Sequence, residues 1–187
     1  MNENFKPDKK IINKDRKEIL KKMKTDLDET QFSSEIIVPE GVKNAPEILT
    51  IDMYEMGVGN DEALGEFYFT PLVTDEDKTG FFNCVITLSE TLDETNLANL
   101  YEALTVLNFH LLSGSFGVDM NRNYLAYKLT VPYPLDMKKD SLSDLVNVTM
   151  GNAFMICDQW IDMVLRISEG KGDVDDVIDA FGLSDGN

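Results

Sequence analysis

Residues 107–135 read LNFHLLSGSFGVDMNRNYLAYKLTVPYPL, and this stretch decides the fold class because the spacing of its apolar residues changes partway through. Up to Gly114 the apolar residues recur at helical spacing, in the stripe Leu97, Leu100, Leu104, Leu107 and Leu111. After Gly114 they alternate as in strands, on either side of the turn residues 121–123. The stretch therefore predicts a helix followed by a β-hairpin, which ends near Pro132 and Pro134 because proline cannot donate a ladder hydrogen bond.

Three strand-like runs precede this helix, at residues 47–56, 66–73 and 80–88. The connections between them are polar and contain glycine, which is typical of antiparallel hairpins. Side chains alternate along a strand, so the third run has one apolar face that we assign to the core: Phe82, Cys84, Ile86 and Leu88. Thr91 with Glu94 forms a capping-box pattern and predicts where the following helix begins.

Helices are also predicted at both ends of the chain. In residues 11–28 a narrow apolar stripe predicts an amphipathic helix, peripheral to a core that lies mostly after Glu47: Ile12, Ile19, Leu20, Met23 and Leu27. Residues 33–46 carry Ser-Ser, Pro-Glu-Gly and Ala-Pro, and we interpret them as a linker. A long helix runs from the capping pattern of Ser141 and Asp144 to about Ser168, and a short one lies within 173–181.

The predicted order, α-β-β-β-α-β-β-α, describes an α+β protein. Over residues 11–168, including the helix and hairpin of 101–135, this pattern resembles the type III secretion chaperone-like fold that the YbjN-like family of small bacterial proteins shares. The resemblance implies a five-stranded antiparallel sheet packed with helices, frequent dimerisation and binding of other polypeptides. We divide the chain into a basic N-terminal helix and arm (1–33), an α+β domain (34–170) and an acidic tail (171–187).

The charges are unevenly placed along the chain. Residues 1–24 hold nine Lys or Arg and four Asp or Glu, a balance of +5, whereas residues 25–187 hold eight and thirty, a balance of -22. Binding of nucleic acid rests largely on Lys and Arg displacing counterions, so an acidic body disfavours nucleic acid and anionic lipid as partners. The polar N-terminus and the lack of a long apolar run predict a cytoplasmic protein without a membrane span.

No sequence motif of a catalytic, cofactor or metal site is present. His110 is the single histidine, which leaves no histidine cluster for a metal and makes a Ser-His-Asp or Cys-His system improbable. Cys84 and Cys157 lie in apolar runs and are interpreted as buried thiols, with a disulfide or redox switch as the alternative. Gly57-Val58-Gly59 lacks the residues that follow a phosphate-binding loop.

Two acidic clusters, residues 75–77 and the tail aspartates, do not have calcium-loop spacing and are interpreted as solvated loops: Asp173, Asp175, Asp176 and Asp179. A pair of carboxylates acting in a cleft stays open, because their separation is a property of the fold. A bound metal, or a pocket with convergent carboxylates, would favour an enzyme, and an open groove lined by Tyr and Leu would favour a binding protein.

The face of the sheet opposite the core supplies the candidate partner-binding residues. Strand parity assigns an apolar, aromatic set to it: Tyr54, Tyr68, Val85, Tyr124, Ala126 and Thr130. This face is either ordinary core, covered by the first helix, the tail or a second subunit, or a docking surface for another chain. We predict a non-catalytic protein- or peptide-binding module, chaperone-like or a regulatory adaptor, that forms a homodimer. The acidic rim favours a partner polypeptide with basic residues around an apolar stretch, through charge complementarity. The alternatives are a small-molecule-sensing regulator and an enzyme that uses carboxylates.

Overall fold

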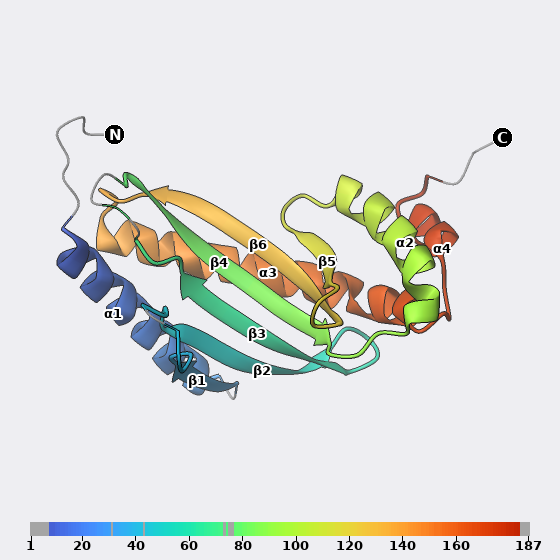
Figure 1. Ribbon diagram of the computed structural model, residues 1–187, viewed down its shortest axis with the longest axis horizontal. Helices are drawn as coiled ribbons and strands as arrows, with labels where there is room; N and C mark the ends of the chain where they lie inside the picture. The colour runs from blue at the N-terminus through green and yellow to red at the C-terminus, as the bar shows by residue number, and fades with distance from the viewer. Residues whose placement is uncertain (1–7, 31, 43, 73, 75–76, 184–187) are drawn as a thin grey trace. The chain divides into compact units, whose positions relative to one another are not determined.

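The computed structural model describes residues 8–30, 32–42, 44–72, 74 and 77–183 (Figure 1). Within them the chain is α+β, as predicted. The helices are α1 (Lys9–Asp28), α2 (Leu97–His110, after a 3-10 turn at Glu94–Asn96), α3 (Lys139–Ser168) and α4 (Val174–Ala180). The strands are β1 (Ser33–Ile37), β2 (Ile48–Met56), β3 (Asp61–Phe69), β4 (Thr79–Ser89), β5 (Ser115–Asp119) and β6 (Tyr124–Pro134).

The described strands form one six-stranded sheet in the order β1-β2-β3-β4-β6-β5. The prediction of five strands was wrong by one, because residues 33–46 were interpreted wholly as a linker and residues 33–37 form β1. This strand pairs antiparallel with β2 from Ser33↔Asp52 to Ile37↔Ile48. None of the described helices is long and apolar enough to cross a membrane.

The chain divides into two compact units. Unit 1 consists of residues 1–53, 64–85 and 130–152, and unit 2 of residues 54–63, 86–129 and 153–187. The strands β2, β3, β4 and β6 and the helix α3 contribute residues to both units. Residues 1–33 and 34–53 therefore belong to the same unit, and the domain boundaries predicted at residues 33 and 170 stay predictions.

In unit 1, helix α1 begins at a cap and buries one face. The Asp8 carboxylate accepts hydrogen bonds from the backbone N–H groups of Lys10 and Ile11, which have no partner inside a helix. The buried residues of α1 recur at helical spacing: Arg16, Ile19, Leu20, Met23 and Leu27. The helix was expected to be peripheral, but these apolar side chains belong to the core.

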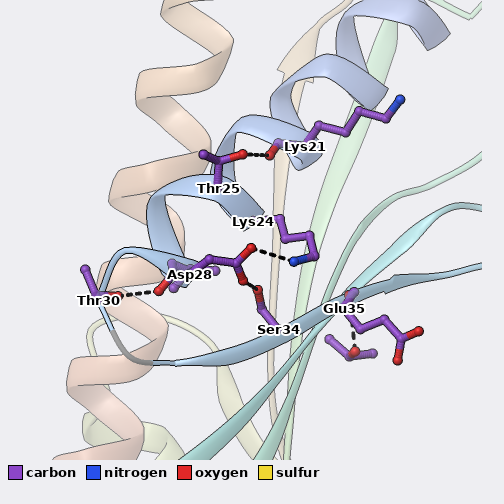
Figure 2. Close-up of polar contacts among 9 residues, drawn as sticks. Lys21, Lys24, Thr25, Asp28, Thr30, Ser34 and Glu35 are labelled. Carbon is purple, nitrogen blue, oxygen red and sulfur yellow. Dashed lines mark hydrogen bonds and ion pairs between the residues drawn. The ribbon is translucent and has the colours of Figure 1, made fainter.

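Side-chain hydrogen bonds at the end of α1 connect this helix to β1 (Figure 2). The sequence alone shows these residues only as polar and does not predict the bonds. The Asp28 carboxylate accepts from Lys24 Nζ at 2.6 Å and from Ser34 Oγ at 2.9 Å, and these bonds hold its pKa below the ordinary value. Thr30 Oγ1 donates to the carbonyl of Leu27 at 2.8 Å. The bond between Asp28 and Ser34 links the end of α1 to the start of β1.

In unit 2, the helix and hairpin predicted from residues 107–135 are confirmed. Strand β5 pairs with β6 from Ser115↔Lys128 to Asp119↔Tyr124. The Asn108 side chain donates to the carbonyl of Phe116 and accepts from its N–H, both at 2.8 Å, so α2 holds the first hairpin strand in place. The helix start was predicted incorrectly: Asp93, whose carboxylate accepts from the Thr95 N–H, caps the 3-10 turn in place of Thr91.

The observed bounds of the two C-terminal helices agree closely with those predicted from the sequence. Helix α3 begins at Lys139, two residues before the predicted cap, and ends at Ser168 as predicted. Asp173 caps α4 in a capping box with Asp176. Phe181, which follows α4, stacks on Trp160 with ring centroids 4.8 Å apart.

The first prediction tests whether α1 belongs to the core. Met23 is 2% exposed, so Met23→Ala removes buried methylene groups and leaves a cavity. We expect the free energy of unfolding, measured by urea denaturation, to fall by about 2–5 kcal/mol. Lys22→Ala, on the exposed side of the same helix turn, is the control and should change it by less than about 0.5 kcal/mol. Equal, small effects of both substitutions would show that α1 is peripheral.

Candidate functional site

A groove of about 750 Å³ lies in unit 1, between α1, the connection from β1 to β2, and the residues at the end of β3. Its walls are largely apolar, and its polar residues come mainly from α1 and from the residues before β2. The lining residues are Asn13, Arg16, Lys17, Leu20, Val38, Val42, Asn44, Ala45, Pro46, Glu47, Phe69, Pro71 and Leu72.

Arg16 is the buried cation of this groove, with 5% of its surface exposed. Its Nε donates to the hydroxyl of Tyr133 at 2.7 Å, and its Nη1 donates to the carbonyl of Thr70 at 3.0 Å. The guanidinium also lies 5.3 Å from the ring centre of Phe69 and 5.7 Å from that of Tyr133, within the range of a cation–π interaction. One side chain of α1 is therefore bonded to β6 and to the residue after β3.

Two buried polar atoms of the groove residues lack a hydrogen-bond partner within the described part of the chain: Arg16 Nη2 and Glu47 Oε2. The other oxygen of Glu47 accepts from Lys17 Nζ at 2.6 Å. A buried donor or acceptor without a partner costs free energy, and the cost is larger for a charged group. The described residues thus leave one donor of a buried cation and one acceptor of an anion without a hydrogen bond.

Tyr133 and Gly80 complete the surroundings of Arg16. Burial raises the pKa of Tyr133, with the Arg16 cation opposing the shift, so the hydroxyl that accepts from Arg16 is neutral near pH 7. A Cβ placed on Gly80 would lie 2.5 Å from Tyr133 Cζ and 2.8 Å from Arg16 Nη2. The absence of a side chain at residue 80 therefore leaves the space that these two groups occupy.

The residues predicted for partner binding differ widely in exposure. Tyr54 is 56% exposed and Thr130 is also exposed, whereas Tyr68 and Tyr124 are half-buried. Val85 and Ala126 are only 8% and 1% exposed, so these two residues are buried, in line with the core alternative, and do not present an outer surface. Strand parity assigns a residue to a face and does not predict how far that face is covered. The partner-binding role of the exposed and half-buried members stays a prediction.

Of that set, Tyr68, Val85 and Thr130 lie in unit 1, and Tyr54, Tyr124 and Ala126 in unit 2. In unit 1 a series of side-chain hydrogen bonds connects neighbouring strands. Thr130 Oγ1 donates to Asn83 Oδ1, and Asn83 Nδ2 donates to Thr70 Oγ1, each at 2.9 Å. Thr130 is thus part of a polar link between strands and not of an apolar patch.

Other candidate chemical groups lie in unit 2. His110 is half-buried, and its ring contacts those of Phe109 and Phe181 at 5.1 and 4.8 Å. The backbone N–H groups of Gly57, Val58 and Gly59, weighed as a phosphate-binding loop, donate to Asp158 and Asp162. Carboxylates of this chain therefore already occupy these donors.

Both cysteines are buried, as predicted, and neither forms a disulfide; burial raises the pKa of Cys84 to about 12. In the tail, Asp173 caps α4 and Asp176 pairs with Arg166 at 2.8 Å. Of the acidic turn at residues 75–77, only Asp77 lies within the described residues, where its carboxylate accepts from Thr74. No group of three or more His, Cys, Asp or Glu suited to a metal ion occurs among the described residues.

Comparisons with known proteins place the chain near two solved structures. No family model matches the sequence, and no curated protein matches it. YbjN, a candidate transcription regulator from E. coli, is similar at a TM-score of 0.38 and 14% identity, over 73% of this chain and 86% of that one. An uncharacterized protein from Methanothermobacter thermautotrophicus is similar at a TM-score of 0.36 and 17% identity, over 82% of this chain and 99% of that one.

YbjN is thus among the structures similar to this chain, as the sequence resemblance predicted. Both TM-scores are low, so the proposed function rests on the residues of this chain and not on these two structures.

The second prediction concerns the space around Arg16. In Gly80→Ala the added methyl group would meet Tyr133 and Arg16, so the cluster must shift. We expect the free energy of unfolding to fall by about 1–3 kcal/mol, as in other overpacked sites. Gly117→Ala in β5 is the matched control, because no atom lies within 4 Å of its added Cβ. An equally stable Gly80→Ala protein would contradict the close packing of this cluster.

Proposed function

We propose that this chain is a non-catalytic module that binds a segment of another polypeptide in the groove of unit 1. One observation carries the proposal: an apolar groove of about 750 Å³ whose residues include a buried donor and a buried acceptor with no partner among the described residues. A polypeptide segment provides the complement, because it presents apolar side chains together with backbone donors and acceptors. Groove volumes of roughly 300–1,000 Å³ suit drug-sized ligands, and several residues of a peptide are of that size.

The walls of the groove support a binding role over catalysis by carboxylates. A glycosidase-type mechanism uses two carboxyl groups at a defined separation. Glu47 is the single carboxylate among the described lining residues, and Lys17 already neutralises one of its oxygens. We therefore favour a binding module, acting as a chaperone or a regulatory adaptor, over an enzyme.

A small-molecule-sensing regulator is the second candidate, since the volume of the same groove also suits a small organic acid. The two candidate functions predict ligands of different size. A peptide reaches the outer rim of the groove, where Val38 and Val42 are 56% and 59% exposed, whereas a small acid fills only the region next to Arg16. Dimerisation is a further expectation from the sequence, which light scattering on the 21.1 kDa chain tests separately.

The third prediction tests the groove directly. A pool of random octapeptides is passed over the immobilised protein, and bound peptides are identified by mass spectrometry. Val42→Asp places an unpaired charge on the apolar rim and should lower peptide retention at least tenfold, because a charge that a ligand must desolvate is costly.

Val58→Asp is the matched control, because Val58 is 93% exposed and does not line the groove. This variant should retain peptides as the unsubstituted protein does. The proposal is contradicted if the folded protein retains no octapeptide, or if Val42→Asp and Val58→Asp retain peptides equally.

A further inference from the structure

We infer that the groove takes an acidic segment of the partner polypeptide, in which Asp or Glu residues flank a short apolar stretch. Exposed lysines of α1 next to the groove pair with the carboxylates, and the apolar walls receive the apolar side chains. This inference rests on the proposed function and narrows it to one class of polypeptide.

Five lysines form a stripe along α1, three or four residues apart, a spacing that places them on one side of the helix. The lysine stripe consists of Lys10, Lys14, Lys17, Lys21 and Lys24. In Figure 2 the side chains of Lys21 and Lys24 extend from this side of α1. Asn13, Lys17 and Leu20 line the groove, so the groove adjoins the lysine stripe.

The acidic residues of α1 lie mostly on the side away from the lysine stripe. Asp15, Glu18 and Asp26 recur there at helical spacing. Asp28 is the one acidic residue of α1 on the side of the stripe, and it forms an ion pair with a lysine of the stripe at 2.6 Å. The flank of α1 beside the groove is therefore cationic, whereas the opposite flank carries charges of both signs.

Two lysines of the stripe, Lys10 and Lys21, are available to a ligand. Both are exposed, and neither forms an ion pair with a described residue. The other three each pair with one carboxylate, as Lys14–Glu18 at 3.8 Å, Lys17–Glu47 at 2.6 Å and Lys24–Asp28 at 2.6 Å. New pairing with a ligand carboxylate therefore falls to Lys10 and Lys21.

The spacing of these two lysines sets the spacing of the ligand carboxylates. Lys10 and Lys21 lie just before and just after the residues of α1 that line the groove, which run from Asn13 to Leu20. A helix rises about 1.5 Å per residue, so the two positions are about 16 Å apart along α1. About five residues of extended chain span that length. A segment along the groove can place one carboxylate against each lysine and apolar residues between them.

The walls of the groove favour polypeptide over nucleic acid as the acidic ligand. Leu20 and Phe69 are buried, while Val38 and Val42 are 56% and 59% exposed. Apolar side chains placed against the two valines remove apolar surface from water, which is favourable. The sugar–phosphate backbone of nucleic acid carries no such side chains, and its affinity rests largely on phosphate contacts.

The charge near the groove differs from the net charge that predicted a basic partner. Unit 2 holds four Lys or Arg and sixteen Asp or Glu, a balance of -12, whereas α1 holds eight and four, a balance of +4. Among the described lining residues Glu47 is the single acidic one, and it pairs with Lys17. At physiological salt, exposed charges farther apart than about 8 Å are largely screened from each other. The lysines beside the groove therefore decide which sign of charge it attracts.

The test compares three pools of acetylated and amidated octapeptides, whose ends carry no charge. The pools share a central stretch of Leu, Val and Ser and differ only in the residues on both sides of it, which are Glu, Gln or Lys. An exposed ion pair changes an equilibrium constant by a factor of roughly 1.5 to 5. In calorimetric titration the Glu pool should therefore bind at least about threefold more tightly than the Gln pool, through two such pairs. The Lys pool should bind most weakly.

The outcomes separate this inference from the proposed function. Equal binding of the three pools, or tightest binding of the Lys pool, would overturn the inference and leave the proposed function intact. Binding of no pool by the folded protein would contradict the proposed function as well. In about 1 M salt the preference for Glu over Gln should disappear, because exposed ion pairs are screened. A preference that persists there would also overturn the inference.

Charge reversal locates the effect on α1. Lys21→Glu should reduce the preference for the Glu pool over the Gln pool at least about twofold, and Lys10→Glu should act in the same direction. Lys22→Glu is the matched control, because it changes the net charge equally at an exposed position outside the lysine stripe, and it should keep the preference. All three variants replace exposed lysines and should fold. Equal loss of the preference in Lys21→Glu and Lys22→Glu, or loss in neither, would overturn the inference.

An oligothymidylate of eight nucleotides supplies the nucleic-acid arm, as a polyanion without apolar side chains. We expect it to bind more weakly than the Glu pool at the same salt concentration. Tighter binding of the oligonucleotide would assign the lysine stripe to phosphate groups and overturn the inference.

Discussion

The burial of one cation, Arg16, determines much of how unit 1 is built. A charge removed from water is tolerated only where dipoles and other charges surround it, so each element near Arg16 has to supply an acceptor or a ring face. Tyr133 of β6 supplies a hydroxyl, Thr70 a backbone carbonyl and Phe69 an aromatic face. Gly80 of β4 supplies space. Helix α1 is thereby bonded into unit 1 by a polar cluster within an apolar face, and this fixes its position more specifically than apolar contacts alone would.

The polar groups of that cluster do not form all their possible hydrogen bonds, and this connects the fold with the proposed function. The acceptors around Arg16 use its Nε and Nη1 and leave Nη2, while Lys17 occupies only one oxygen of Glu47. Buried polar groups in native proteins are almost always paired, so each exception calls for an explanation. Here both exceptions belong to residues that line one groove.

The sequence predicts the elements that have a strong period and misses those fixed by tertiary contacts. The α2 stripe and the alternation on either side of Asn121–Asn123 predicted the helix and hairpin correctly, because both patterns are local. Strand β1 was missed because SSEII is short and polar at its start, and its pairing with β2 is supported by Asp28 and Ser34, whose contact no local pattern shows. The cap at Asp93 was missed because Thr91 and Glu94 offered an equally good local signal.

The candidate site was harder to predict than the fold. Arg16 falls on the same helical stripe as Ile19, Leu20 and Met23, so a charged residue interrupting an apolar face was the available signal, and it was overlooked among nine basic residues. No sequence pattern identified Glu47, because its contact with Lys17 depends on the path of the chain between β1 and β2. Strand parity did assign Phe82, Cys84, Ile86 and Leu88 to the core correctly, yet it could not show that Val85 and Ala126 on the opposite parity are also buried.

Nuclear magnetic resonance of the arginine side chains tests the central claim most directly, because the chain has three arginines, Arg16, Arg122 and Arg166. The Arg16 Nε–H should give a separate, slowly exchanging signal, since it is buried and bonded to Tyr133. Titration with the octapeptides that the immobilised protein retains should shift the Arg16 signal, because Arg16 lines the groove, while those of Arg122 and Arg166 stay in place. Saturable binding of the peptides without any change at Arg16 would contradict the assignment of this guanidinium as the centre of the binding site.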